Sequence, residues 1–532
     1  MLGGGARLPL RERLVVADGR SAALVGADGA IDWWCPDRVD GPPLLWRLLD
    51  PDGAALRVGP AGACSRSLAY DGTTLLTRTL LDTGTGAVEV VDGLDGGLLR
   101  VATIVKGELD IEVVLAPGRA WRRSTRFEPF DGGVVFDGWV LRAPGLAFSR
   151  SAEGARAAGR FRTGERVVVS LDRLDAPLVP EQGALDRLDD QRQRWRRLAG
   201  STLYEGPGAD AVRRSVLLLS AVPTRSVTTS ITAPGREELA LDSRHTFVAD
   251  ACAAHHLLDE LGHPEPAADA LAWLRRIVVR DWPLPSAFAC DGEPGPVAED
   301  RSGLAGWRGA PVRVGIGGEQ PAVDLDLPGA LATVVAPLAA ERWSALVRVA
   351  DGVADALPPA LVERVRCWAL LDEAARVARA RNPLDLDAAG WHGTIRRLRR
   401  EVEEAMAQEP EQVGDDPRLL RLTWQGPLPG HHELVAQAVD HVLERRGEGP
   451  FVHAQEGASV AASLWAVRAE AVLGRWEAAH ERFERLLAWV GPAAVLPRLV
   501  EPVSGRFTGD LPDAPAHLAL LAAARTLAAG PR

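Results

Sequence analysis

The sequence of 532 residues holds almost no lysine, tyrosine or methionine. Lys106 is the only lysine, so nearly all of the 61 basic residues counted as lysine or arginine are arginine. Only two tyrosines, Tyr70 and Tyr204, and two methionines occur. The formal net charge is −11, whereas a protein that binds nucleic-acid phosphates needs clustered cations. We therefore expect no nucleic-acid partner.

Recognisable metal and phosphate motifs are also lacking. Five cysteines are scattered without a Cys-x-x-Cys pair, which favours reduced, buried thiols over disulfides or a zinc site. The histidine pairs His255-His256 and His431-His432 have no second ligand set three or four residues away. The glycine-rich segment 315–320 is not a Walker loop. The sequence therefore predicts neither a metal nor an organic cofactor.

Long apolar runs are absent as well. Residues 1–19 lack the apolar core and the cleavage motif of a signal peptide, and no stretch of about 18 uninterrupted apolar residues follows. Hydrophobic residues nevertheless make up 46% of the chain, enough for a large core. These features predict a cytoplasmic protein without a membrane partner.

Two kinds of periodicity divide the chain. Residues 1–195 alternate apolar and polar residues around Asp-Gly turns, as antiparallel hairpins do, and end in a charged linker helix near 185–200. Residues 196–532 show helical spacing, and we expect no strands between those helices. Helices are predicted at 209–222, 247–262, 266–279, 341–357, 359–380, 433–446, 457–474, 475–490 and 514–529. The predicted fold class is α+β, with an N-terminal antiparallel β-sandwich domain (1–195) followed by a helical toroid or bundle (196–532). The connection 282–325 is rich in proline and glycine and is expected to carry part of any site.

One stretch, ELALDSRHTFVADAC, concentrates ionisable groups just before an apolar helical run. It contains Asp242, Arg244, His245 and Asp250. In one interpretation Asp242 braces a helix start and Asp250 pairs with a nearby arginine. In the other, the four residues line a ligand pocket, where His245 can exchange a proton near neutrality. The sequence leaves both open.

Blocks along nearly the whole chain resemble one enzyme family. DGRSAALVGADGAIDWWCPDRVDGP (18–42) resembles the N-terminal signature of bacterial glycoside hydrolase family 15, which comprises glucoamylases, glucodextranases and trehalase-like proteins. Four further blocks are similar to that family's motifs and follow in its order, at 306–320, 364–378, 455–489 and 500–520. The resemblance implies a β-sandwich followed by an (α/α)₆ barrel, with a small-molecule ligand of the α-glucoside or trehalose class in the barrel cavity. A homodimer through the sandwich faces is compatible with the sequence.

The resemblance fails at the catalytic carboxylates. Family members invert with one acid and one base about 6.5–9.5 Å apart. The acid belongs to a PD-x-GIWE-x-R segment, but residues 349–363 read VADGVADALPPALVE, with Asp351, Asp355 and Glu363 lacking the accompanying tryptophan and arginine. Arg498 stands where the base is expected, and a guanidinium cannot accept a proton at neutral pH. We therefore expect the standard acid and base to be lost.

The sugar-gripping motif of the family, WDYRYCWLRDA, is thinned to LDSRHTFVADA (241–251), where Ala249 replaces the gripping arginine. The candidate site residues are those that match positions of the family's motifs or that have a suitable side chain nearby in the sequence. The candidate catalytic residues are Asp242, His245, Asp250 and Glu456. The candidate ligand-binding residues are Arg244, Phe247, Trp307, Arg308, Asp326 and Arg498.

The primary hypothesis is a divergent protein of α-glucoside or trehalose metabolism, in which hydrolysis would need carboxylates other than the standard pair. Two alternatives stay open: a carbohydrate-binding pseudoenzyme, and a non-hydrolytic barrel enzyme such as a cyclase, isomerase or dehydratase, because one fold hosts many chemistries. The lining of the cavity should distinguish them. A polar cavity with tryptophan favours sugar, and a deep apolar cavity with one acid favours cyclisation.

Overall fold

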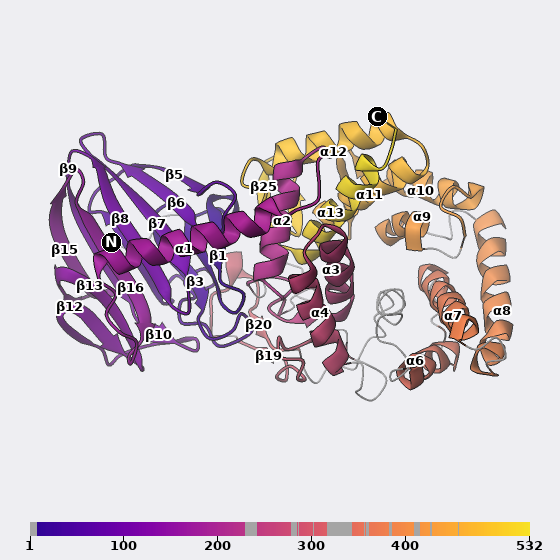
Figure 1. The fold of residues 1–532 in the computed structure, drawn as a ribbon, viewed down its shortest axis with the longest axis horizontal. Helices are drawn as coiled ribbons and strands as arrows, with labels where there is room; N and C mark the ends of the chain where they lie inside the picture. The colour runs from indigo at the N-terminus through magenta and orange to yellow at the C-terminus, as the bar shows by residue number, and fades with distance from the viewer. Residues whose placement is uncertain are drawn as a thin grey trace.

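The chain has a β-rich N-terminal half joined to a helix-rich C-terminal half (Figure 1). The computed structural model describes residues 8–228, 242–277, 285, 287–301, 303–316, 343–355, 357, 361–381, 386–408, 415–425, 428–455 and 457–531.

Two seven-stranded antiparallel sheets form the N-terminal half. In spatial order, the first holds β1 (Arg13–Ala17), β2 (Ala22–Gly26), β3 (Ala30–Cys35), β4 (Ala55–Pro60), β9 (Glu108–Ala116), β15 (Gly154–Arg162) and β14 (Ser149–Ser151). The second holds β12 (Glu128–Phe136), β13 (Trp139–Ala147), β16 (Arg166–Arg173), β8 (Leu98–Lys106), β7 (Ala87–Leu94), β6 (Thr77–Asp82) and β5 (Ser65–Tyr70). A short ribbon of β10 (Gly118–Arg119) and β11 (Arg122–Arg123), and the 3₁₀ turn η1 (Leu10–Glu12), complete this half. The expected antiparallel β-structure is confirmed.

Burial along the strands shows which strands are covered by protein on both faces. Strand β6 of the second sheet alternates buried and exposed residues, as a strand with one solvated face does. Strands β1, β2 and β3 are buried at every position. Protein therefore covers both faces of these three strands, which explains their nearly continuous apolar composition.

Helices dominate the second half, and each segment expected to be helical beyond residue 208 contains one. They are α1 (Glu181–Gly200), α2 (Ala209–Ala221), α3 (Val248–Glu260), α4 (Pro264–Ile277), α6 (Trp343–Asp355), α7 (Leu361–Arg381), α8 (Leu386–Gln408), α9 (Leu422–Gln425), α10 (Glu433–Arg446), α11 (Val460–Val472), α12 (Trp476–Val490) and α13 (Ala514–Ala528), with the 3₁₀ turns η3 (Trp307–Gly309) and η5 (Pro417–Arg421). The sequence pattern did not predict α8, whose first half contains Gly390 and Gly393, residues that disfavour helix. The predicted domain boundary at 195–196 lies inside α1, and the division into two domains stays a prediction.

The expectation of no strands in the second half is wrong. A five-stranded antiparallel sheet is formed by β21 (Gly447–Glu448), β22 (Phe451–Ala454), β23 (Gly457–Ser459), β24 (Leu499–Glu501) and β25 (Arg506–Thr508). Two-stranded ribbons join β17 (Thr246–Phe247) to β18 (Ala287–Phe288) and β19 (Glu299–Asp300) to β20 (Arg313–Val314). Strands this short are held by partners distant in sequence, so no local alternation of two or three residues could reveal them.

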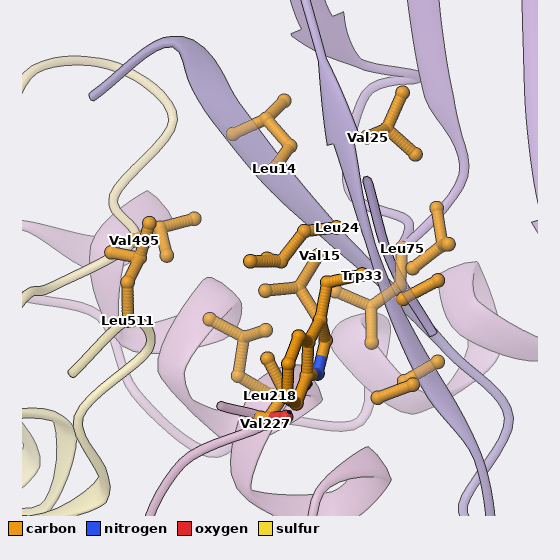
Figure 2. Packing of buried hydrophobic residues seen from close by; sticks show 14 of the residues in the cluster. Leu14, Val15, Leu24, Val25, Trp33, Leu75, Leu218, Val227, Val495 and Leu511 are labelled. Carbon is orange, nitrogen blue, oxygen red and sulfur yellow. Dashed lines mark hydrogen bonds between the residues drawn. The ribbon is translucent and has the colours of Figure 1, made fainter. Parts of the chain in front are cut away.

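The two halves share a hydrophobic core (Figure 2). Trp33 of β3 lies among residues of the first sheet, of α2 and of the C-terminal segment, including Leu218 and Leu511. Its indole Nε1 donates a hydrogen bond of 2.6 Å to the carbonyl oxygen of Val227. A second core cluster lies within the helical half and includes Trp273, Trp368 and Trp391. The shared core fixes the sheets against the helices that carry the candidate site.

None of the five cysteines, all of which lie in the described residues, forms a disulfide bond. Cys35, Cys252 and Cys367 are buried, as expected, whereas Cys64 and Cys290 are partly exposed, so the expectation of buried thiols is wrong for these two. Among the helices of the described ranges, none is long and apolar enough to cross a membrane.

Candidate functional site

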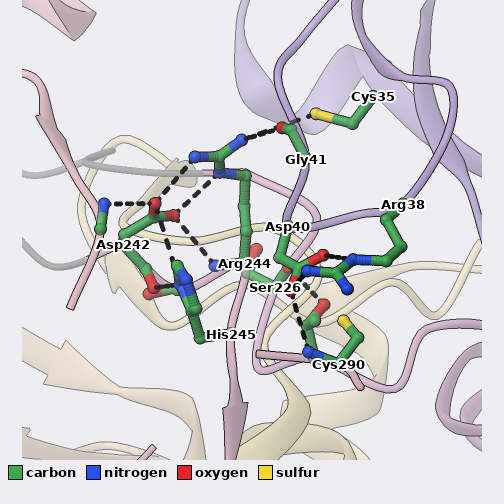
Figure 3. Close-up of polar contacts among 12 residues, drawn as sticks. Cys35, Arg38, Asp40, Gly41, Ser226, Asp242, Arg244, His245 and Cys290 are labelled. Atoms are coloured by element: carbon green, nitrogen blue, oxygen red, sulfur yellow. Dashed lines mark hydrogen bonds and ion pairs between the residues drawn. The ribbon is translucent and has the colours of Figure 1, made fainter. Parts of the chain in front are cut away.

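Asp242 and Arg244 form a buried ion pair in the loop before α3 (Figure 3). The arginine Nε and Nη2 donate to the two carboxylate oxygens at 2.8 and 2.7 Å, and the side chains are 0% and 2% exposed. The amide of Gly315 donates to the same carboxylate at 2.8 Å. Nη1 of the arginine reaches the carbonyl oxygen of Gly41, in the N-terminal half, at 2.7 Å. The pair thus ties three distant segments together.

The ionisation of Asp242 follows from these contacts. Burial alone would raise the pKa of its carboxyl group. The charge and hydrogen bonds of Arg244, with His245 and the Gly315 amide, outweigh that effect and lower the pKa to about 2. The carboxylate is therefore ionised at neutral pH and cannot act as a proton donor. The contacts are those of a structural brace, and a catalytic role for Asp242 stays a prediction.

His245 lies beside this pair but is only 1% exposed. Its Nδ1 is 3.1 Å from the carbonyl oxygen of Asp242, and its Nε2 is buried with no hydrogen-bond partner among the residues that the structure describes. The imidazole does not line the cavity described below.

Asp250 lies in the first turn of α3 and does face that cavity. Nε of Arg225 donates to its Oδ2 at 2.8 Å, and the same guanidinium lies 3.4 Å from the ring centre of Phe247, which is buried. Asp250 therefore fits both interpretations of the sequence. It pairs with an arginine, as the structural interpretation expected, and it lines a cavity, as the ligand-pocket interpretation required.

The remaining candidates are dispersed. Trp307 is buried under the guanidinium of Arg13, 5.6 Å from the ring centre, and Arg308 beside it is exposed. Arg498 lines the cavity, with its Nη1 3.8 Å from Oδ2 of Asp510. The candidates Glu456 and Asp326 lie outside the described residues.

The cavity has a volume of about 1060 Å³ and is bounded by α3, α11, α13 and the η5–α9 segment. Its lining combines two tryptophans, small apolar residues and many charged groups. The arginines that line it are Arg225, Arg418, Arg421, Arg446, Arg468, Arg498 and Arg525, and the aspartates are Asp250, Asp415, Asp416 and Asp513. Sequence reasoning identified two of these eleven residues, Asp250 and Arg498.

Helix α11 and the η5–α9 segment each contribute one arginine and one tryptophan, and each arginine lies over the tryptophan of the other segment. Arg421 lies over the ring of Trp465 at 5.2 Å, and Arg468 lies over the ring of Trp424 at 4.4 Å. Each arginine is three residues from the other's tryptophan in sequence, at Arg421–Trp424 and Trp465–Arg468. Burial, and secondarily the charge of Arg421, lowers the pKa of Arg468 to about 10.

Asp513 is the carboxyl group of the cavity wall best suited to hold a proton near neutrality. It caps α13, with its Oδ2 accepting from the amide of Ala516 at 3.0 Å. Burial, with the nearby charges of Asp510 and Asp250, outweighs Arg498 and Arg225 and raises its pKa to about 7. An aspartate directly before an apolar helix was the available sequence signal, but it indicates a cap and not a proton donor.

Among the side chains that the structure describes, the segments expected to carry the family's acid and base contribute no carboxyl group to the cavity wall. Asp351 on α6 accepts a hydrogen bond from the indole of Trp391 at 2.8 Å. Within the described ranges, neither Asp351 nor Asp355 is among the cavity-lining residues. Glu363 belongs to α7, but its side chain is not among those that the structure describes. Arg498, which the motif comparison places at the expected base position, does line the cavity.

Comparison with known proteins agrees with the motifs. No protein-family model matches the chain. The chain is 23% identical to a trehalase of Mycolicibacterium smegmatis, over 96% of this chain and 90% of that one. It is 24% identical to a trehalase of Mycobacterium tuberculosis, over 96% and 88%. A bacterial glucoamylase solved in complex with acarbose has the same fold, with a TM-score of 0.72, 11% identity and coverage of 99% and 96%.

Similarity to trehalases along nearly the whole chain, together with the fold of a bacterial glucoamylase, confirms that this protein is trehalase-like and resembles glycoside hydrolase family 15.

Proposed function

We propose that this protein binds an α-glucoside, such as trehalose, in the cavity between α3, α11 and α13, and that it has lost the inverting acid–base pair of its relatives. The observation that supports this most directly is Arg498, a cavity-lining guanidinium at the position expected for the general base. The cavity would be the interior of an (α/α)₆ barrel formed by the second half of the chain.

The cavity fits a sugar better than an apolar cyclisation substrate. Its volume of about 1060 Å³ is at the upper end of ordinary small-molecule sites, so a disaccharide can be accommodated. Paired groups such as Arg225–Asp250 and Arg418–Asp416 supply donors and acceptors for hydroxyl groups. Trp424 and Trp465 provide aromatic surface for the C–H faces of a pyranose ring.

Slow hydrolysis through other carboxylates is the second candidate function. Asp513 is the group that favours it, since a carboxyl group with a pKa of about 7 can donate a proton to a leaving oxygen near neutral pH. Asp250, whose charge acts on Asp513, is a candidate for activating water in the same wall, but its Oδ2 already accepts from Arg225. Without a free partner we expect turnover to fall by about 10²–10⁴-fold relative to an enzyme with both groups in place.

The test combines binding with product analysis. The melting temperature would be measured with trehalose, maltose, glucose and acarbose, and released glucose would be followed by NMR with its anomeric form resolved. Stabilisation by a sugar with little or no turnover is the expected result. Rapid release of β-glucose would overturn the loss of catalysis, and a rearranged product would favour a non-hydrolytic barrel enzyme. No stabilisation by any of the four sugars would overturn sugar binding.

Two subsidiary proposals concern the protein's setting. We infer a cytoplasmic location, which the five cysteines support because none forms a disulfide bond. We also propose a homodimer through the faces of the N-terminal sheets, which light scattering of the full chain would test.

A further inference from the structure

Arg225 lies at the cavity wall, and hydrogen bonds hold its backbone on both sides. Its amide donates a hydrogen bond of 3.0 Å to the carbonyl oxygen of His245. Its carbonyl oxygen accepts one of 2.8 Å from the amide of Ala514, the first residue of α13. The backbone of Arg225 is therefore fixed against the loop before α3 on one side and against α13 on the other.

The side chain of Arg225 is directed at Asp250, in the first turn of α3. Nε donates to Oδ2 of that carboxylate at 2.8 Å, and the two side chains are 24% and 16% exposed. The guanidinium carbon lies 3.4 Å from the ring centre of Phe247, a buried residue directly before α3. Stacking on this ring restricts the plane of the guanidinium, and the ion pair restricts its rotation within that plane.

Both members of the pair line the cavity with groups that suit sugar hydroxyls. Oδ1 of Asp250 accepts no hydrogen bond from the residues that the structure describes. A guanidinium carries five N–H donors in one plane and can serve several acceptors. A hydroxyl group both donates and accepts, so one hydroxyl can donate to the carboxylate while its neighbour on the sugar accepts from the guanidinium. Hydrogen bonds to charged groups of this kind are stronger than those between neutral groups.

The neighbouring position 249 shows what Arg225 adds to the cavity. Ala249 precedes Asp250 on α3 and also lines the cavity, but its methyl group can donate no hydrogen bond. The motif comparison expects an arginine at this position. In this chain the guanidinium that reaches Asp250 comes from a residue 25 positions earlier, outside the helix. The cavity therefore contains an arginine–aspartate pair whose arginine belongs to another segment.

We propose that Arg225 supplies the ligand-binding guanidinium that is absent at position 249, and that Arg225 and Asp250 together bind two neighbouring hydroxyl groups of the sugar. The inference rests on the proposed sugar site and extends it by naming the groups that select the ligand. Arg225 is then a determinant of specificity, because a sugar that lacks either hydroxyl leaves a partly buried charged group without that hydrogen bond.

The experiment measures dissociation constants by calorimetry for trehalose, for glucose and for the 2-, 3-, 4- and 6-deoxy analogues of glucose. The full-length protein is compared with Arg225→Ala, with the double variant Arg225→Ala/Ala249→Arg, and with Arg485→Ala, a control on α12 whose arginine is 54% exposed. In the wild type and the control, removal of either of two neighbouring hydroxyls should weaken binding at least about tenfold.

The variants should change this pattern in a way that a purely structural arginine would not. In Arg225→Ala, glucose should bind at least about tenfold more weakly, and the analogue that lacks the hydroxyl bound by Arg225 should bind as well as glucose does. The double variant should recover most of the affinity and of the discrimination. If Arg225→Ala does not fold, Arg225→Lys keeps the charge but lacks the planar set of donors, and it should lose the same discrimination.

The outcomes separate this inference from the proposal on which it rests. A wild type that binds none of these sugars overturns both. Unchanged sugar binding in Arg225→Ala, or equal affinity of the wild type for glucose and every deoxy analogue, overturns the role of Arg225 and leaves the sugar site intact. Affinity in Arg225→Ala that falls by one common factor for glucose and all analogues shows structural support only, and it also overturns that role. A loss that the double variant does not restore overturns the replacement of one arginine by the other.

Discussion

Replacing Asp242 by asparagine tests whether the buried cluster is a brace or part of the chemistry. Asp242 pairs with Arg244 through two hydrogen bonds at 0% and 2% exposure, so the substitution leaves a guanidinium buried without its counter-ion. Breaking a buried pair by removing one partner costs about 3–5 kcal/mol. The loss of the bond from Gly315 adds to that cost. We expect the melting temperature to fall by about 3–5 °C, because the unfolding entropy of a chain of 532 residues is about 1 kcal/mol/K.

The pH dependence gives an independent measure of the same interaction. The folded protein lowers the pKa of Asp242 from its ordinary value of 3.8 to about 2, which corresponds to about 2 kcal/mol of stabilisation. Because the folded pKa is depressed, this stability is fully present above about pH 4 and is lost as the pH falls through 2. The Asp242→Asn variant should lack this component of the acid-induced loss of stability.

The assay is thermal and acid unfolding followed by circular dichroism, with Glu481→Gln as a control. Glu481 and Arg485 form an exposed pair on α12, at 67% and 54% exposure, and such a pair contributes less than about 1 kcal/mol. A variant Asp242→Asn that unfolds like the control but no longer binds sugar would refute the brace and return this residue to the ligand site.

Three further predictions concern the cavity and the core. Asp513→Asn should raise the free energy of unfolding above pH 7. The folded state raises the pKa of Asp513 to about 7, so the wild type loses stability as the pH rises from about 4 to 7. Denaturant unfolding between pH 5 and 8 should therefore depend less on pH in the variant, which retains a side chain that can cap α13. Trp33→Phe removes the hydrogen bond to Val227 and leaves that buried carbonyl unpaired, at a cost of about 1–3 kcal/mol in urea unfolding; an unchanged midpoint would contradict the role of this bond at the junction. Arg498→Glu restores a carboxylate at the expected base position, but glucose release from trehalose should stay low, because no acid partner is restored with it; rapid turnover would show that the missing base was the only defect.

The elements that the sequence predicted well are those whose signal is local. Helices such as α10 and α12 carry an apolar stripe that repeats along the helix itself, and their observed bounds match the expected segments within one residue. Strands β23 and β24 pair across some forty residues of intervening chain, and neither is long enough to show a period of two. Their existence depends on tertiary contacts that no window of sequence contains.

The cavity escaped prediction for a related reason. Arg468 packs on Trp424, and Arg421 packs on Trp465, so each contact joins segments that are separated by α10 and by the β21–β23 strands. From sequence, an arginine three residues from a tryptophan on a helix is a common pattern that does not indicate a cavity. The charged residues at 242–250 were predicted as candidates instead. A high density of charged residues in a sequence does not show whether they form a structural ion pair or line a pocket.

The charge of Arg498 bears directly on the proposed loss of acetal hydrolysis. The transition state of glycoside cleavage resembles an oxocarbenium ion, so it is stabilised by nearby negative charge. Arg498 lines the cavity, and the family motif places the general base at this position. If the proposal is correct, an arginine here has two effects on cleavage: it cannot accept a proton from water, and its charge opposes the positive charge that develops on the sugar.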